Sequence, residues 1–169
     1  MSRLLPVILG VWLGLLVASW VAATQSFRTV DRVLGPALRS ELRERLAPVA
    51  ADDRRAVLRH LASEINRWMF RHWSLAQLAL GVLALALAWR LSGPGWLLLT
   101  AAIVVCLVQG FGLAGPITEL GRAIDFVPRP LPAETARRFG LLHAAYLGLD
   151  LLKAGLLAGA AWILAPRLS

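Results

Sequence analysis

Residues 4–23 read LLPVILGVWLGLLVASWVAA and contain no charged side chain. A helix needs about 20 apolar residues to cross a bilayer, so this stretch is long enough to span one. Residues 73–89 and 96–115 are likewise uncharged, and residues 139–164 carry only His143, Asp150 and Lys153 as ionisable groups. The sequence therefore predicts an all-α integral membrane four-helix bundle, with spans at about residues 4–26, 73–90, 95–115 and 138–165.

The composition supports this prediction and narrows the function. The 169 residues are 58% apolar and only 17% charged, which is unusual for a soluble domain, and we expect one membrane domain over residues 1–169. The net charge of +8 comes mainly from arginines between the apolar stretches, where they face lipid headgroups. No nucleic-acid-binding, phosphate-loop, nucleophile or zinc motif accompanies them, so we expect no nucleic acid partner, no metal site and no enzymatic activity.

The longest connection between spans is strongly basic. Residues 27–72 hold ten arginines and six acidic residues. A short helix is expected before Pro48, and a longer one begins near Asp52. The longer one is amphipathic, because its apolar residues recur at helical spacing: Val57, Leu58, Leu61, Ile65, Trp68 and Met69. We expect residues 37–72 to form a helical segment that lies at the membrane interface or over the bundle and runs into the second span.

Two connections contain turn signals. Residues 91–95, LSGPG, predict a tight turn that makes the second and third spans an antiparallel hairpin. Residues 128–132 contain three prolines and exclude a helix there, and residues 133–135 then open the fourth helix.

Arginine asymmetry predicts the topology. With four spans, Arg3, Arg90 and Arg167 lie on one side of the membrane, and the other fourteen arginines lie on the opposite side. The positive-inside rule places residues 27–72 and 116–137 in the cytoplasm and both termini outside, in a bacterial inner membrane. The first apolar stretch could alternatively be a secretory signal peptide cleaved after residues 21–23, but its length favours a retained helix.

The fourth helix carries the candidate functional residues, which share one helical face: His143, Tyr146, Asp150 and Lys153. Charges near mid-membrane are costly and are often functional. Asp150 and Lys153 are one turn apart and can neutralise each other. The pair then either fixes the orientation of the helix or marks a path for a proton, ion or solute.

Glutamines lie toward the cytoplasmic ends of the first three spans: Gln25, Gln77 and Gln109. If they face inward, they line a polar pocket with His143 and Tyr146. Alternatively, they are hydrogen-bonding contacts between helices. His72 and His143 both lie at cytoplasmic ends, so a haem bound between them is a less favoured alternative to having no cofactor.

The last helix resembles the corresponding signature of the transmembrane protein 205-like family in Arg138-Phe139, Leu142-His143, Tyr146 and Lys153, and the region after Gln25 is loosely similar. The resemblance implies a four-span membrane protein of undefined activity. It brings no catalytic residue with it.

Three hypotheses about function follow. The first is a non-enzymatic membrane protein that handles a small solute or proton through the polar face, as an oligomer if it transports, or that serves as a scaffold. The second is an accessory subunit of a membrane complex, bound through the amphipathic helix and through two glycine pairs, Gly10 with Gly14 and Gly155 with Gly159. The third is a haem-binding redox subunit.

Overall fold

Helices make up most of the chain in a computed structural model, which describes residues 4–35, 40–89 and 94–165. The described residues contain no strand, which confirms the predicted all-α class. In chain order the elements are α1 (Leu4–Val33), α2 (Ser40–Leu46), α3 (Ala51–Ala88), α4 (Gly95–Leu107), the π-helical segment η1 (Val108–Leu113), α5 (Ala114–Ile124) and α6 (Ala133–Leu164).

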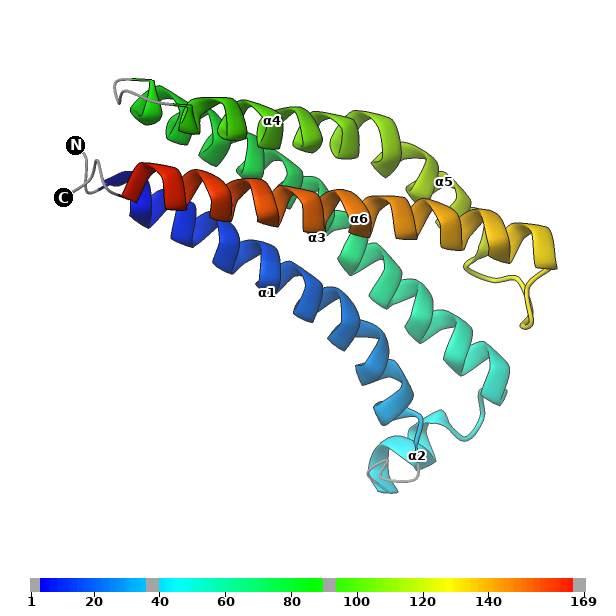
Figure 1. The fold of residues 1–169 in the computed structure, drawn as a ribbon. Helices are drawn as coiled ribbons and strands as arrows, with labels where there is room; N and C mark the ends of the chain where they lie inside the picture. Colours follow the sequence, from blue (N-terminus) through cyan, green and yellow to red (C-terminus); the bar gives the residue numbers. More distant parts are fainter. Residues whose placement is uncertain (1–3, 36–39, 90–93, 166–169) are drawn as a thin grey trace.

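The long helices form a four-membered bundle. Four of them are long and apolar enough to span a membrane: α1, α3, the continuous helix Gly95–Ile124 and α6. α1 packs on α3, α3 on α4, α4 on α6, and α6 returns to α1. The start of α1 and the end of α6 lie at one end of the bundle, here called the terminal end, and α2 lies at the opposite, basic end (Figure 1). Toward the basic end, α1 and the first half of α3 slope away from α6 (Figure 1).

The core at the terminal end is entirely apolar. α1 contributes Leu5, Leu9, Trp12 and Leu16, whose spacing of four, three and four places them on one face of a helix. Their partners from the other three spans include Ala84, Ala88, Leu99, Ala102, Leu157, Ala160 and Leu164. The alanines let the helices approach closely, which is a common way for membrane helices to pack.

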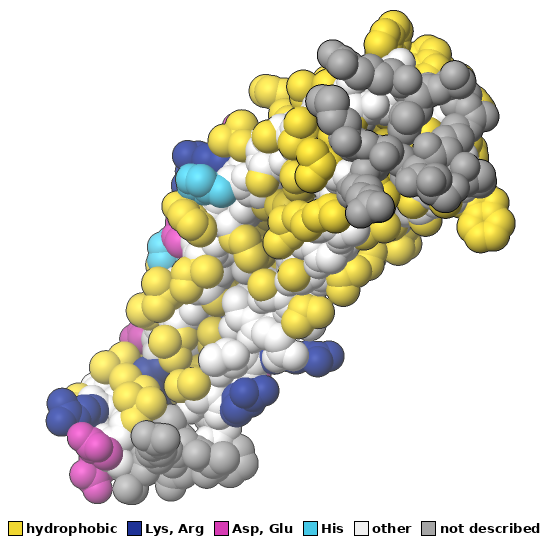
Figure 2. Space-filling model, turned by 90° about the vertical axis from the view of Figure 1, so that its left-hand side faces the viewer, with side chains coloured by type: hydrophobic (Ala, Val, Ile, Leu, Met, Phe, Trp, Pro, Cys, Tyr) yellow, Lys and Arg dark blue, Asp and Glu magenta, His cyan; other side chains and the backbone are white. Residues whose placement is uncertain are grey.

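The outer surface of the bundle is apolar as well. Large hydrophobic side chains are exposed along every span, including Val7 and Val21 of α1, Val82 of α3, Val104 of α4 and Leu151 of α6. Figure 2 shows such side chains over most of one face, with charged groups toward its left and lower parts. An apolar surface of this extent is suited to lipid and not to water, and the chain is a membrane protein.

Two helices continue past the predicted ends of their spans. α1 continues beyond residue 26 to Val33, and the third span continues beyond residue 115 to Ile124. The prediction that residues 116–137 form a loop is therefore wrong for its first part. Pro116 does not stop the helix because it lies in the first turn of α5, directly after the π-helical segment, where a proline is tolerated. The proline-rich connection begins only after Ile124, and α6 starts at Ala133 as expected.

The longer amphipathic helix predicted from near Asp52 and the second span form one unbroken helix, α3. The shorter helix before Pro48 is the separate helix α2. The apolar stripe of α3 points away from the bundle, so the longer amphipathic helix does not fold over the bundle through that stripe. Val57, Leu61, Ile65 and Trp68 are between 53% and 64% exposed, whereas Asn66 is buried.

Parts of some predictions lie outside the described residues. These are the turn residues 91–93, residues 37–39 of the basic segment, and the arginines Arg3, Arg90 and Arg167.

Gly81 lies at a close contact between α3 and its neighbouring helices and gives a test of the packing. A Cβ atom at this position would lie 2.7 Å from Ile103 Cγ1 and 2.9 Å from Trp12 Cη2. We expect Gly81→Ala to lower the stability by about 1–3 kcal/mol, because the overpacked helices must separate. Thermal unfolding in detergent measures this. The control is Gly10→Ala, where a Cβ atom would meet nothing within 4 Å. Equal melting temperatures of the Gly81→Ala and Gly10→Ala variants would contradict the packing described.

Candidate functional site

A polar centre of four side chains joins three of the long helices near the middle of their lengths. It consists of Trp20 from α1, Gln109 from η1, and Asp150 and Lys153 from α6. Asp150 and Lys153 are three residues apart on one helix, and this spacing brings their charged groups together. Asp150 is 4% exposed and Lys153 is 0% exposed. The predicted ion pair is therefore present, and it lies inside the bundle.

Each charged group has several partners. Lys153 Nζ lies 2.8 Å from Asp150 Oδ1 and donates to Gln109 Oε1 at 2.6 Å. The Gln109 side-chain amide donates to Asp150 Oδ1 at 2.9 Å and to the Tyr146 carbonyl oxygen at 3.0 Å. Trp20 Nε1 donates to Asp150 Oδ2 at 3.0 Å. Within the described residues, the one buried side-chain nitrogen or oxygen without a partner is Arg54 Nε, outside this centre.

The π-helical segment places Gln109 in the centre. η1 interrupts the third span with one wide turn, and Gln109 is its buried residue. Its amide both donates and accepts within the centre, so it connects the third span to both charges of α6. π-helical turns inside α-helices are rare and are frequently found at functional sites.

A second polar contact lies one layer nearer the terminal end. Gln77 of α3 is buried, and its Oε1 atom accepts from Trp12 Nε1 at 3.4 Å and lies 3.8 Å from Cys106 Sγ. Gln77 therefore acts as a hydrogen-bonding contact between helices. This corresponds to the second of the two roles considered for the glutamines.

Not all the predicted residues lie in the centre. Gln25 is exposed, so the expectation that it lines a pocket with the other glutamines is wrong; α1 has sloped away from α6 at that level. His143 is also exposed, and its Nδ1 atom lies 3.1 Å from the Phe139 carbonyl oxygen. Tyr146 is half-buried, with its ring edge-on to Phe70. The polar face of α6 therefore runs from the buried centre to the surface at the basic end.

The two histidines of the haem alternative both lie at the surface. His72 Nδ1 lies 2.8 Å from the Trp68 carbonyl oxygen, and the rings of Trp68 and His72 pack together with centroids 4.3 Å apart. His143 makes the same kind of contact within α6. Neither imidazole faces the polar centre, and a bound haem stays a prediction.

Buried polar side chains occupy only one half of the bundle. Within the described residues they are Ser19, Asn66, Gln77, Gln109, Asp150 and Lys153. They lie in the polar centre, in the adjoining layer that contains Gln77, or toward the basic end. The other half holds buried apolar side chains with at most 1% exposure, such as Leu5, Leu99 and Leu164. The polar groups therefore form no continuous line across the bundle.

A second charged group, missed by the sequence analysis, connects α3 to the end of α5. Arg67 donates two hydrogen bonds of 2.9 Å to the Asp125 carboxylate and another to Glu64. His60 Nδ1 lies 2.8 Å from Asp125 Oδ2, and Arg122 Nε lies 3.4 Å from Glu64 Oε1. We call these five residues the α3–α5 cluster. The signal in the sequence was the spacing of His60, Glu64 and Arg67, which share a helical face away from the apolar stripe.

The electrostatics of this cluster favour an ionised Asp125. Burial opposes the charge on its carboxylate, but hydrogen bonds from Arg67 and His60 outweigh that effect and hold the pKa of Asp125 below its ordinary value. His60 is partly buried and packs against Phe126 with ring centroids 4.9 Å apart.

Comparison of the chain with protein-family models, with curated proteins and with solved structures found no match.

The polar centre predicts an unequal response to single and double replacement. Lys153→Leu should destabilise the chain by about 3–5 kcal/mol, because it leaves the Asp150 carboxylate buried without its cation. Replacing Asp150 and Lys153 together with Leu should cost less, about 1–3 kcal/mol, because only the hydrogen bonds of Trp20 and Gln109 are lost. Unfolding in detergent compares the two variants. A double variant at least as unstable as Lys153→Leu would show that the pair is not coupled as described.

Proposed function

We propose that this chain is a non-enzymatic accessory or scaffold subunit of a membrane assembly, and that α1 docks a transmembrane helix of its partner. The observation that carries the proposal is that the exposed face of α1 is lined by small residues. Gly10, Gly14, Ala18 and Ala22 follow one another at four-residue spacing, and all four are exposed. A Cβ atom added at Gly10 or Gly14 would meet nothing within 4 Å.

Small residues at this spacing favour association between membrane helices, because they let two backbones approach closely. Valines beside them, including Val7, Val11, Val17 and Val21, are also exposed and supply packing area. The bundle does not use this face for its own packing, since α1 turns Leu5, Leu9, Trp12 and Leu16 inward. The fourth helix contributes less, because a Cβ atom at Gly159 would lie only 3.2 Å from Leu98.

The polar centre supports a subunit more than a single-chain transporter. Its charges are saturated by side chains, and the terminal half of the bundle is closed by apolar packing. A solute or ion crossing the bundle would have to pass that apolar half. In the proposed function the ion pair fixes how α1, the third span and α6 meet, and so keeps the outward face of α1 in place.

The remaining parts of the proposal come from the sequence. Arginine asymmetry supports a bacterial inner-membrane location with the basic end in the cytoplasm and both termini outside. The resemblance to the transmembrane protein 205-like family supports a four-span membrane protein of undefined activity and brings no catalytic residue with it. The partner is either a second copy or another membrane protein.

One observation favours a second candidate, the binding of a proton or small solute at the polar face. The Asp150–Lys153 pair adjoins a π-helical turn, and its face continues through Tyr146 to exposed His143 at the basic end. Such a site is reached from one side only. In this alternative, the Asp150/Lys153 double variant folds and assembles but loses its function.

Enlarging the small-residue face of α1 tests the first proposal. We expect the wild-type protein, extracted in a gentle detergent, to have a mass above that of one chain. Gly10→Ile with Gly14→Ile should reduce it to a single chain without unfolding the bundle, since both positions are open. Light scattering and native mass spectrometry measure the mass.

The matched control is Ala86→Ile, which also places a large side chain at an exposed small residue, but on α3. This variant should keep the wild-type mass. A wild-type protein that consists of one chain alone, or a Gly10/Gly14 variant with the wild-type mass, would argue against docking through α1.

A further inference from the structure

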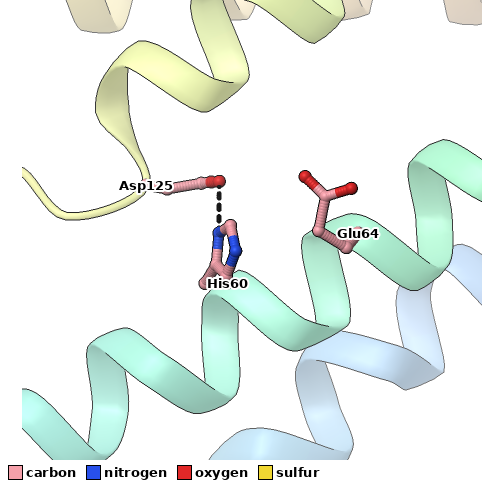
Figure 3. A group of neighbouring side chains, drawn as sticks. All are labelled: His60, Glu64 and Asp125. Atoms are coloured by element: carbon pink, nitrogen blue, oxygen red, sulfur yellow. Dashed lines mark hydrogen bonds and ion pairs between the residues drawn. The ribbon is translucent and has the colours of Figure 1, made fainter.

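The α3–α5 cluster contains a set of metal-binding side chains. His60 and Glu64 are four residues apart on one face of α3, and Asp125 reaches them from the end of α5 (Figure 3). One ligand atom from each lies within 4.8 Å of the other two. The side chains of His60 and Glu64 are 38% and 40% exposed and that of Asp125 is 7% exposed, so the site is open to solvent on the α3 side.

The separations are close to those of a metal site. Zinc–nitrogen and zinc–oxygen bonds of about 2.0–2.2 Å place tetrahedral ligand atoms about 3.4 Å apart. His60 Nδ1 and Asp125 Oδ2 are 2.8 Å apart and need to separate slightly. Glu64 needs to approach by rotating its side chain, and Figure 3 shows its carboxylate on the same side of α3 as His60. One imidazole with two carboxylates suits zinc-like divalent ions better than Mg²⁺ or Ca²⁺, which prefer oxygen ligands alone.

Arg67 and such an ion would compete for the same two carboxylates, those of Glu64 and Asp125. The Arg67 guanidinium binds both oxygens of Asp125 and also Glu64, so it neutralises the same carboxylates. A divalent ion therefore has to displace Arg67 from at least one carboxylate. This competition has a consequence that a purely structural ion-pair cluster does not have: removal of Arg67 strengthens metal binding.

We propose that His60, Glu64 and Asp125 bind a zinc-like divalent cation at the basic end, in competition with Arg67. The ion joins α3 to the end of α5 with water in its open coordination positions. When the ion is bound, it replaces Arg67 as the link between α3 and Asp125. This site is separate from the small-residue face of α1, so it stands whether or not α1 docks a partner.

The test is titration of the full-length protein with Zn²⁺. The chain is purified in detergent without a histidine tag, and calorimetry gives the affinity and stoichiometry. Co²⁺ serves as a spectroscopic probe of the ligand set. We expect one Zn²⁺ per chain in the wild type, with Mg²⁺ bound far more weakly. His60→Ala and Asp125→Asn should each weaken Zn²⁺ binding about tenfold or more, because each removes a ligand.

Two further variants make the test specific. Arg67→Gln should bind Zn²⁺ about tenfold more tightly than the wild type, because the competing charge-assisted hydrogen bonds are gone. His143→Ala is the matched control, since this histidine of α6 is exposed and is not a member of the cluster, and it should bind as the wild type does. Thermal unfolding without metal checks that every variant is folded. No Zn²⁺ binding by the wild type, unchanged binding in folded His60→Ala, or no gain in folded Arg67→Gln would each overturn the proposal.

Discussion

A carboxylate and an ammonium group in the apolar interior of a membrane bundle must both find partners, because the medium around them supplies none. Asp150 and Lys153 pair with each other, and the remaining hydrogen-bonding positions of Asp150 are filled by Trp20 and Gln109. Those partners come from two other spans. The need to satisfy one ion pair therefore sets the rotation of α1, of the third span and of α6 about their own axes.

This constraint divides the bundle into two halves. On the terminal side, beyond the contact between Trp12 and Gln77, apolar residues and alanines hold the four spans together. On the basic side, α1 and α3 slope away from α6, and charged side chains such as Arg67 and Asp125 connect the helices instead. With α1 held by Trp20 near its middle, its small residues, such as Gly10 and Gly14, face outward.

The sequence predicted the features that depend on local composition. The four spans, the Asp150–Lys153 pair and the proline-rich break before α6 follow from charge, hydropathy and helical spacing. The features it missed depend on tertiary geometry. Pro116 looks like the end of a span because nothing local reveals the π-helical turn before it. Gln25 looks like a partner of Gln109 unless one knows that the helices diverge there. Trp20 looks like any other tryptophan in an apolar stretch until the fold places it beside Asp150.

The central claim is that Asp150 is paired with Lys153 and closed off by its three partners, Lys153, Trp20 and Gln109. Dicyclohexylcarbodiimide, which enters membranes and reacts with accessible protonated carboxyl groups, tests it directly, with peptide mass spectrometry to locate the product. At neutral pH we predict no modification of Asp150 in the wild type and clear modification in a Lys153→Leu variant, where the cation is absent. Efficient modification of wild-type Asp150 would contradict the closed ion pair and favour the proton-binding alternative.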